Sequence, residues 1–248
     1  MIVKNNLLNF KNKIIYQDNS SFLFSLDSVL LANFVSINMS TKNIIDLCTG
    51  NGPIPMLLTF RTNAKITGIE IQKEIYDLAV LSAKENNMLG NISYLNMDVN
   101  KLVGKNYDEK YDVVTCNPPY FKVKEKSLLN DDKKKTIARH EVCVTLDDII
   151  RVSKYLLKTG GNFAMVHRPD RMVEILFIMR KYNIEPKKIR FVYPKKGMEA
   201  NMLLVEGIKN GKLGLKILPP LIVHNEDGSY TKEVKKMFGG EEYVAKKL

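Results

Sequence analysis

One short segment early in the chain restricts the possible folds more than any other feature. Residues 43–48 (NIIDLC) are typical of a buried strand, and residues 53–58 (PIPMLL) are typical of a short helix. Gly50 and Gly52 lie between them and allow positive φ angles and a close approach of the backbone to a ligand, while Pro53 suits a first helical turn. The sequence therefore predicts a strand, a glycine turn and a helix, as in a nucleoside-binding half of an α/β sheet.

A carboxylate follows at the end of the next predicted strand, residues 65–71. Glu70 lies about twenty residues after the glycine turn, the spacing at which an acid binds ribose hydroxyls. A dinucleotide-binding loop would carry a third glycine at position 55, where this chain has Pro55. NAD and FAD are therefore disfavoured, and so is a nicotinamide-dependent oxidoreductase. S-adenosylmethionine, which has a ribose and an adenine but no phosphate, is the cofactor that fits.

Asp46 lies at the end region of the strand that precedes the glycine turn. In this position its carboxylate could hold the ammonium group of the methionine part of the cofactor, through an ordered water or a backbone contact. The alternative is that Asp46 caps the turn that follows, a common role for aspartate.

The tetrapeptide 117–120 (Asn-Pro-Pro-Tyr) follows residues 111–116, which are predicted to form another buried strand. Proline fixes φ and has no N–H, so the backbone here is rigid and its carbonyls point outward. The Asn117 side-chain oxygen and the Pro118 carbonyl could both accept hydrogen bonds from a planar amino group, with the Tyr120 ring stacked on the heterocycle. Alternatively, the tetrapeptide is only a strand-to-loop turn.

The rest of the chain alternates between predicted strands and helices, apart from a polar lead-in over residues 1–20 that we expect to be irregular. Such alternation predicts a mainly parallel sheet with ligands at the carboxyl ends of its strands. Helices are predicted at 25–36, 73–87, 146–157 and 169–181, strands at 162–167, 189–193 and 202–209, and a short helix at 231–238.

Four motifs occur in the order of the predicted strands: residues 46–52 (DLCTGNG), Glu70, Asp98 and residues 117–120. Together they resemble the amino-methylating class of Rossmann-like S-adenosylmethionine methyltransferases. The flanking segments look like those of the tRNA1(Val) adenine-N6 methyltransferase family, and the resemblance covers nearly the whole chain. These segments are residues 24–32, 137–141, 219–224 and 228–231.

The resemblance implies a Rossmann-like class I methyltransferase fold of the α/β class, with a mainly parallel seven-stranded sheet and helices on both faces. We expect one methyltransferase domain over residues 1–248. Within it, residues 1–40 would form an N-terminal segment and helix, 41–212 the catalytic core and 213–248 a C-terminal extension.

The resemblance also implies a reaction: N6-methylation of an adenine in tRNA, at position 37 next to the anticodon of a valine tRNA, with S-adenosylmethionine as methyl donor. The Asn-Pro-Pro-Tyr motif alone is shared with methyltransferases that act on DNA, rRNA and protein glutamine, which stay as alternative substrates. A non-catalytic RNA-binding module is the alternative from another functional class.

Several residues receive cofactor-binding roles from the resemblance. Glu70 would bind the ribose diol, and Asp98 would accept a hydrogen bond from the amino group of the cofactor adenine. Ile71 would pack on that adenine, unless it is a plain core residue. Cys48 stands where many methyltransferases carry the first glycine of the loop, and a small thiol fits there. The full expected set is Asp46, Cys48, Gly50, Gly52, Glu70, Ile71, Asp98 and Asn117.

Asn117, Pro118 and Tyr120 are the expected catalytic residues. Adenine N6 is a poor nucleophile, whereas a sulfonium methyl group is already activated, so positioning must supply most of the catalysis. Hydrogen bonds from N6 to Asn117 and Pro118 would favour a pyramidal nitrogen. Alignment of the nitrogen, methyl carbon and sulfur in one line would supply the entropic part of catalysis.

A lysine-rich segment, residues 121–140, begins directly after this motif. It could clamp phosphates on both sides of an extruded base; the alternative is a solvated surface loop without a specific partner. Arg168, Arg171 and the basic residues of 187–196 are further candidates. The expected substrate-binding residues are Pro119, Phe121, Lys133, Lys134, Lys135, Arg139 and His140.

Composition supports an anionic partner, which we expect to be the anticodon loop of a tRNA. Lysine and arginine number 38 against 27 acidic residues, a net charge of +11. The three cysteines and three histidines are scattered without ligand spacing, so no metal is expected. The sequence has neither an apolar run of about eighteen residues nor a signal-peptide pattern, so we expect a cytoplasmic protein with no membrane contact. A monomer is expected, with a dimer as the alternative.

Overall fold

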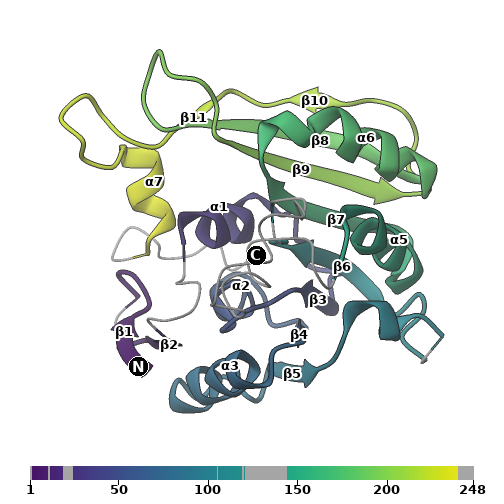
Figure 1. Ribbon diagram of the computed structural model, residues 1–248, viewed down its shortest axis with the longest axis horizontal. Helices are drawn as coiled ribbons and strands as arrows, with labels where there is room; N and C mark the ends of the chain where they lie inside the picture. The colour runs from purple at the N-terminus through teal and green to yellow at the C-terminus, as the bar shows by residue number, and fades with distance from the viewer. Residues whose placement is uncertain are drawn as a thin grey trace, which may run out of the picture.

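The computed structural model describes residues 2–10, 12–18, 25–104, 106–118, 120 and 144–239. Seven strands make up the body of one sheet in the order β8-β9-β7-β6-β3-β4-β5, which runs from top to bottom in Figure 1. These strands are β3 (Asn43–Leu47), β4 (Lys65–Glu70), β5 (Ile92–Asn96), β6 (Tyr111–Cys116), β7 (Leu157–His167), β8 (Ile184–Tyr193) and β9 (Met202–Lys209).

The sheet is mainly parallel, as predicted. Neighbouring strands from β5 through β4, β3 and β6 to β7 are parallel, whereas β9 is antiparallel to both β7 and β8. Two short strands, β10 (Lys216–Ile217) and β11 (Leu221–Ile222), pair in parallel with β8 and extend that edge beyond the seven expected strands.

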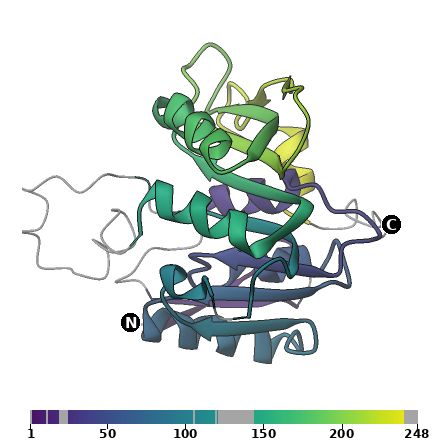
Figure 2. The ribbon, with the colours of Figure 1, turned by 90° about the vertical axis from the view of Figure 1, so that its right-hand side faces the viewer.

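Helices cover both faces of the sheet, because successive strand residues point to opposite sides. Ile44 of β3 belongs to a core shared with α1 (Leu26–Phe34), α2 (Pro53–Leu58) and α3 (Lys73–Glu85). The next residue, Ile45, belongs to a second core, shared with α5 (Leu146–Leu156) and α6 (Met172–Lys181). Helices α5 and α6 lie next to each other on that face (Figure 2).

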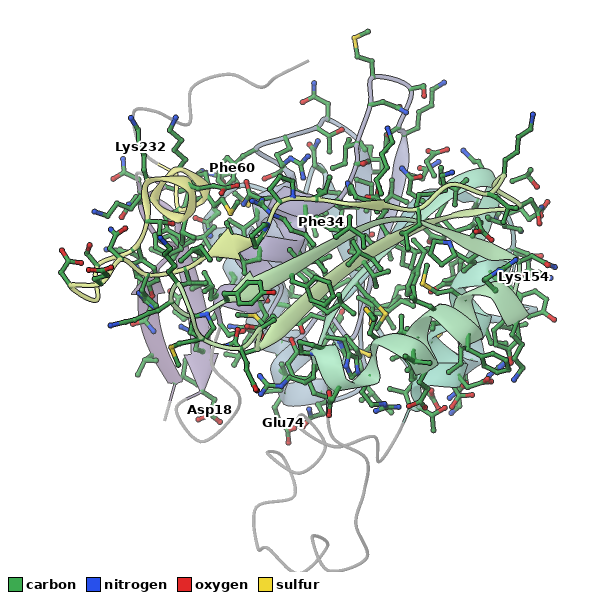
Figure 3. All side chains as sticks on the ribbon, turned by 90° about the horizontal axis from the view of Figure 1, so that it is seen from above. Asp18, Phe34, Phe60, Glu74, Lys154 and Lys232 are labelled. Carbon is green, nitrogen blue, oxygen red and sulfur yellow. The ribbon has the colours of Figure 1, made fainter. Side chains whose placement is uncertain are left out.

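The C-terminal helix α7 (Lys232–Met237) lies beside α1 and adds Val234 to the first core (Figure 1). Seen from above, Lys232 of α7 and Lys154 of α5 lie toward opposite ends of the molecule (Figure 3). None of the described helices has both the length and the apolar character that a membrane span requires.

The helices lie close to where the sequence places them. Those predicted at 25–36, 73–87 and 146–157 are α1, α3 and α5. Helix α5 begins where it does because Thr145 Oγ1 accepts a hydrogen bond from the Asp148 N–H, while the Asp148 carboxylate accepts one from the Thr145 N–H. The helix predicted at 169–181 starts as a 3-10 turn, η3 (Pro169–Arg171), and continues as α6.

The N-terminal segment differs from its prediction. The described residues of 1–20 are not an irregular lead-in: β1 (Ile2–Asn6) and β2 (Ile14–Asp18) form an antiparallel hairpin. A lone hairpin is marginally stable in water, and this one is attached to α3. The Tyr16 N–H donates to Ser82 Oγ at 2.9 Å, and the Ile14 N–H donates to Asn86 Oδ1 at 3.0 Å. These partners are distant in sequence, so local composition gives no sign of the hairpin.

Candidate active site

The predicted cofactor and target motifs meet at the carboxyl ends of three adjacent strands. Leu47 of β3 is paired with Ile69 of β4 on one side and with Cys116 of β6 on the other. The residues that follow these three positions are the glycine turn, Glu70 and Asn117. The topology therefore brings together motifs that are far apart in the sequence, as expected of successive βαβ units.

The glycine turn has the backbone that its sequence suggests. The φ angles of Gly50 and Gly52 are +59° and +87°. A Cβ atom at Gly52 would overlap the hydroxyl of Tyr94, whereas a Cβ at Gly50 would meet open space. Cys48 has a φ of +55°, a left-handed conformation that costs a residue with a side chain about 1–2 kcal/mol. The thiol thus fits in place of a glycine at an energetic cost.

Glu70 binds the turn directly. It is only 6% exposed, and its two oxygens accept hydrogen bonds of 2.9 Å, one from the Gly50 N–H and one from the Gln72 N–H. Burial raises the pKa of Glu70, and the backbone donors oppose that rise. A carboxylate offers about four lone-pair sites, so acceptor capacity is left for hydroxyl donors such as those of a ribose.

Asp46 lies beneath the turn and is completely buried. Its two oxygens accept hydrogen bonds of 2.6 Å from the hydroxyls of Thr49 and Thr115. Burial raises the pKa of Asp46 to about 7, although the two hydroxyls act in the opposite direction. A contact with an ammonium group would therefore pass through an intermediate group, as predicted for a water or backbone contact, and not through an exposed carboxylate.

Two further residues flank this site. The Ile71 side chain is 41% exposed, which contradicts the alternative that it is a plain core residue. Asp98 precedes the short helix η1 (Val99–Leu102), and its Oδ1 accepts a hydrogen bond of 2.8 Å from the Asn100 N–H. Its role toward a cofactor adenine stays a prediction.

Asn117 and Tyr120 form a hydrogen-bonded group with the start of α1. Asn117 Nδ2 donates to Ser28 Oγ at 3.3 Å. The Tyr120 hydroxyl lies 2.6 Å from Asp27 Oδ2 and also contacts Asn117 Oδ1. Burial, followed by the neighbouring Asp27 carboxylate, raises the pKa of Tyr120 well above its ordinary value, so the hydroxyl keeps its proton. Pro118, the next residue after Asn117, is buried.

The Tyr120 ring packs edge-on against His167 at the end of β7, with the ring centroids 5.3 Å apart. His167 is fully buried, and its Nδ1 accepts a hydrogen bond of 2.8 Å from the Arg168 N–H. Burial, with a contribution from Arg171, lowers the pKa of His167 to about 4, so the imidazole is neutral at pH 7. Its Nε2 finds no hydrogen-bond partner in the described part of the chain.

Sequence reasoning missed Asp27, Ser28 and His167 as members of this site. The helix around Asp27 is recognised from its apolar stripe, and the resemblance of residues 24–32 to a family gives Asp27 and Ser28 no separate roles. The signals available are that resemblance and the polar pair Asp27-Ser28 at the start of a mainly apolar helix.

The residues predicted to contact RNA directly after the Asn-Pro-Pro-Tyr motif are not among the described residues. Pro119, Phe121, Lys133, Lys134, Lys135, Arg139 and His140 lie outside the described residues, and their roles stay predictions.

The basic residues of 187–196 largely bind this chain itself. Lys188 contacts Glu206 at 3.1 Å, and Arg190 contacts Glu233 at 2.8 Å. Lys195 Nζ donates to the Glu226 carbonyl at 3.3 Å. The contacts of Arg190 and Lys195 attach the C-terminal segment to β8 and the residues that follow it. All three contacts weaken the case for an RNA site there.

Within the described ranges there is no cluster of three side chains of the kinds that bind metals. The groups gathered at the strand ends are a buried carboxylate with spare acceptor capacity, an exposed apolar side chain, and an amide beside a protonated phenol. This arrangement can bind hydroxyls and a planar amino group.

Comparison with known proteins agrees with this geometry. Residues 25–183 match the methyltransferase small domain family. A curated tRNA1(Val) (adenine(37)-N6)-methyltransferase from Parabacteroides distasonis is 31% identical over 202 residues, which cover 79% of this chain and 81% of that protein. A Bacteroides fragilis protein of the same name is 24% identical over 92% of this chain and 96% of its own length.

Among solved structures, that of a predicted O-methyltransferase from Agrobacterium tumefaciens superposes with a TM-score of 0.68 at 25% identity, over 86% of this chain and 95% of that one. A geranyl diphosphate methyltransferase superposes with a TM-score of 0.56 at 11% identity, over 73% and 76% of the two chains, which shows a shared fold alone.

The fold and the strand-end motifs define a Rossmann-like methyltransferase. The family match and the similar length of the relatives narrow this further: the chain belongs to the methyltransferase small domain family, and within it to the family of the tRNA1(Val) (adenine(37)-N6)-methyltransferases.

Proposed function

We propose that this protein transfers the methyl group of S-adenosylmethionine to N6 of adenine 37, next to the anticodon of tRNA1(Val). The observation that carries the proposal is the meeting of the glycine turn, Glu70 and Asn117 at the ends of β3, β4 and β6. The names of the relatives from P. distasonis and B. fragilis support the substrate. As a tRNA-modifying enzyme, it would act in the cytoplasm.

The residues at the glycine turn fit S-adenosylmethionine. Glu70 has acceptor capacity left for a ribose hydroxyl, and the exposed Ile71 side chain offers an apolar surface for an adenine. Space is open above Gly50, where a side chain would otherwise project. When bound, this cofactor supplies a methyl group that is already activated on a sulfonium.

The buried Asp46 adds an electrostatic contribution to the binding of the cofactor. With a pKa of about 7, it is partly protonated and partly ionised near neutral pH. A cation bound close to it favours the ionised carboxylate, so Asp46 can adjust its charge to the cofactor without moving. Thr49 and Thr115 hold it in place through their hydroxyls.

The target amino group would be held by Asn117 and Pro118. The bond from Asn117 Nδ2 to Ser28 Oγ directs the side-chain oxygen of Asn117 to the opposite side, toward Tyr120. Hydrogen bonds from N6 to this oxygen and to the Pro118 carbonyl would draw the N–H bonds toward the protein and favour a pyramidal, more nucleophilic nitrogen. Because the methyl donor needs no acid, alignment of the reacting atoms is the main contribution of the protein.

Because an anticodon-loop base is already single-stranded, placing it in this site costs less than extruding a base from a duplex. Mass spectrometry of nucleosides from total tRNA, rRNA and DNA, prepared with and without the gene, tests the function in the cell. The proposal predicts that N6-methyladenosine disappears from tRNA1(Val) alone. Its loss from rRNA or DNA instead would reassign the substrate.

A further inference from the structure

The hydroxyl of Tyr120 has two possible hydrogen-bond acceptors, the Asp27 carboxylate and the side-chain oxygen of Asn117. Its oxygen lies 2.6 Å from Asp27 Oδ2 and is also in hydrogen-bond contact with Asn117 Oδ1. A tyrosine hydroxyl carries a single proton, so it can donate to only one of these oxygens at a time. The oxygen that does not receive the proton faces a lone pair of Tyr120 and needs another donor.

The charge of Asp27 decides between the two. A hydrogen bond to an ionised acceptor is about twice as strong as one to a neutral amide oxygen. In the structure, Asn117 Nδ2 donates to Ser28 Oγ, so the amide oxygen Oδ1 is the atom that faces Tyr120. The hydroxyl proton therefore points to Asp27. The oxygens of Asn117 and Tyr120 then face each other with lone pairs, and neither donates a proton to the other.

We propose that Asp27 is a positioning residue for methyl transfer: by taking the hydroxyl proton of Tyr120, it leaves the side-chain oxygen of Asn117 free to accept the target amino group. This inference rests on the proposed function and explains how its target site is prepared. In this role Asp27 acts through Tyr120, whose hydroxyl lies 2.6 Å from Asp27 Oδ2. Without its charge, the Tyr120 hydroxyl would turn to Asn117 and compete with the substrate for the one acceptor that the reaction needs.

A purely structural role for Asp27 gives different expectations. Asp27 lies in the first turn of α1, where a carboxylate also stabilises the helix through its dipole. Loss of that effect would lower the melting temperature, whether or not position 120 carries a hydroxyl. The inference requires instead that the effect of Asp27 depends on the hydroxyl of Tyr120.

The experiment uses the full-length protein, S-adenosylmethionine and a tRNA1(Val) transcript. Asp27→Asn keeps the shape of the side chain, but its amide can donate to Tyr120 and so lets the hydroxyl donate to Asn117. We expect Asp27→Asn to lower kcat by about tenfold or more, with the Kd for S-adenosylmethionine within about twofold of wild type. Tyr120→Phe keeps the ring but removes the competing hydroxyl. The double variant Asp27→Asn/Tyr120→Phe should therefore be more active than Asp27→Asn alone.

Asp77→Asn is the matched control, because it removes the same charge from an exposed position on α3, where Asp77 pairs with Lys73. Its kcat should equal that of wild type. Asp27→Glu, which keeps the charge on a longer side chain, should lose less kcat than Asp27→Asn and gives a second reading if Asp27→Asn does not fold.

Two results would overturn the inference: a kcat for Asp27→Asn equal to that of Asp77→Asn, or an Asp27→Asn effect of the same size in the Tyr120→Phe background. A wild-type protein that methylates no adenine in tRNA would overturn the proposed function and this inference with it. An active wild type without rescue in the double variant would overturn the inference alone.

Discussion

Thr115 Oγ1 donates a hydrogen bond of 2.6 Å to Asp46 Oδ1, and this bond joins the strand that leads to Asn117 to the strand that leads to the glycine turn. The other oxygen of Asp46 accepts from Thr49 within the turn itself. One buried carboxylate thus connects the proposed cofactor and target sites. Its pKa of about 7 makes its charge responsive to what binds there.

Binding of S-adenosylmethionine at pH 7 should release protons. The positive charges of the cofactor favour ionised Asp46, so its pKa falls on binding and a proton leaves. Calorimetry in two buffers with different ionisation enthalpies should give different apparent binding enthalpies for wild type and equal ones for Asp46→Asn. Buffer-independent enthalpies for wild type would contradict this coupling.

The stability of the protein should carry a corresponding pH dependence. The pKa of Asp46 is raised from 3.8 to about 7 in the folded state, so its contribution to stability is present below 3.8 and is lost as the pH rises through about 7. His167 acts in the opposite sense: its pKa is lowered from 6.5 to about 4, so its contribution is present above 6.5 and is lost as the pH falls through about 4.

The pH dependences from Asp46 and His167 overlap between about pH 4 and pH 7, so the contribution of Asp46 is measured as a difference between wild type and a variant without its carboxyl group. The free energy of unfolding of wild type minus that of Asp46→Asn, measured by urea denaturation, should fall as the pH rises from 3.8 toward about 7. A difference that stays constant over this range would show that Asp46 titrates normally in the folded state.

Glu70→Ala should weaken S-adenosylmethionine binding by about 1.5–3 kcal/mol, the usual value of hydrogen bonds to a charged group. It should also lower the melting temperature, since the Gly50 and Gln72 N–H groups lose their acceptor. Glu85→Ala, at the exposed end of α3, is the control and should change neither quantity. Unchanged cofactor affinity in Glu70→Ala would remove Glu70 from the site.

Asn117→Ala should lower kcat by at least about tenfold and leave the Kd for S-adenosylmethionine nearly unchanged, because its contacts to the amino group strengthen toward the transition state. The matched control is Asn91→Ala, which removes a side-chain amide that donates to the Asn63 carbonyl, before the amino end of β5 and away from the carboxyl ends of the strands. Steady-state rates on tRNA and calorimetry separate the two parameters. Turnover near the wild-type value would contradict the proposed role.

The sequence predicts the parts of the fold that local patterns determine. The apolar runs of β3, β4 and β6 and the glycine turn are local, so both their structure and their order are predictable. The hairpin of β1 and β2 is not, because its stabilising partners, Ser82 and Asn86, belong to α3 and the residue that ends it. The contact between Asp27 and Tyr120 is equally long-range. Strand β7 also begins earlier than predicted, at Leu157, and passes through the glycine pair 160–161 that suggests a turn.

Gly52→Ala separates backbone strain from overlap at the glycine turn. Gly52 and Gly228 have similar φ angles, +87° and +85°, but of the two only a side chain at Gly52 would overlap Tyr94. Gly228→Ala should therefore cost about 1–2 kcal/mol of stability from strain alone, and Gly52→Ala more than that, with weaker cofactor binding. Equal losses in thermal denaturation would mean that Tyr94 moves aside without cost.

Neutralising Lys133, Lys134 and Lys135 together should weaken tRNA binding and flatten its dependence on log[salt]. For single-stranded RNA the slope should decrease by about 0.7 for each phosphate that these lysines neutralise in the wild-type complex. The control removes the same number of charges from α7, at Lys232, Lys235 and Lys236, which are exposed. Affinity measurements over a salt series distinguish the two variants. Identical slopes would assign the residues at 133–135 to a solvated surface.

Methylation of a defined RNA by the purified protein tests the proposed function most directly. Wild-type protein, S-adenosylmethionine and an unmodified tRNA1(Val) transcript are incubated, and the RNA is digested and mapped by mass spectrometry. We predict one N6-methyladenosine, at position 37, and none in a transcript with guanine at that position. Methylation at another nucleotide, or equal methylation of both transcripts, would contradict the proposal.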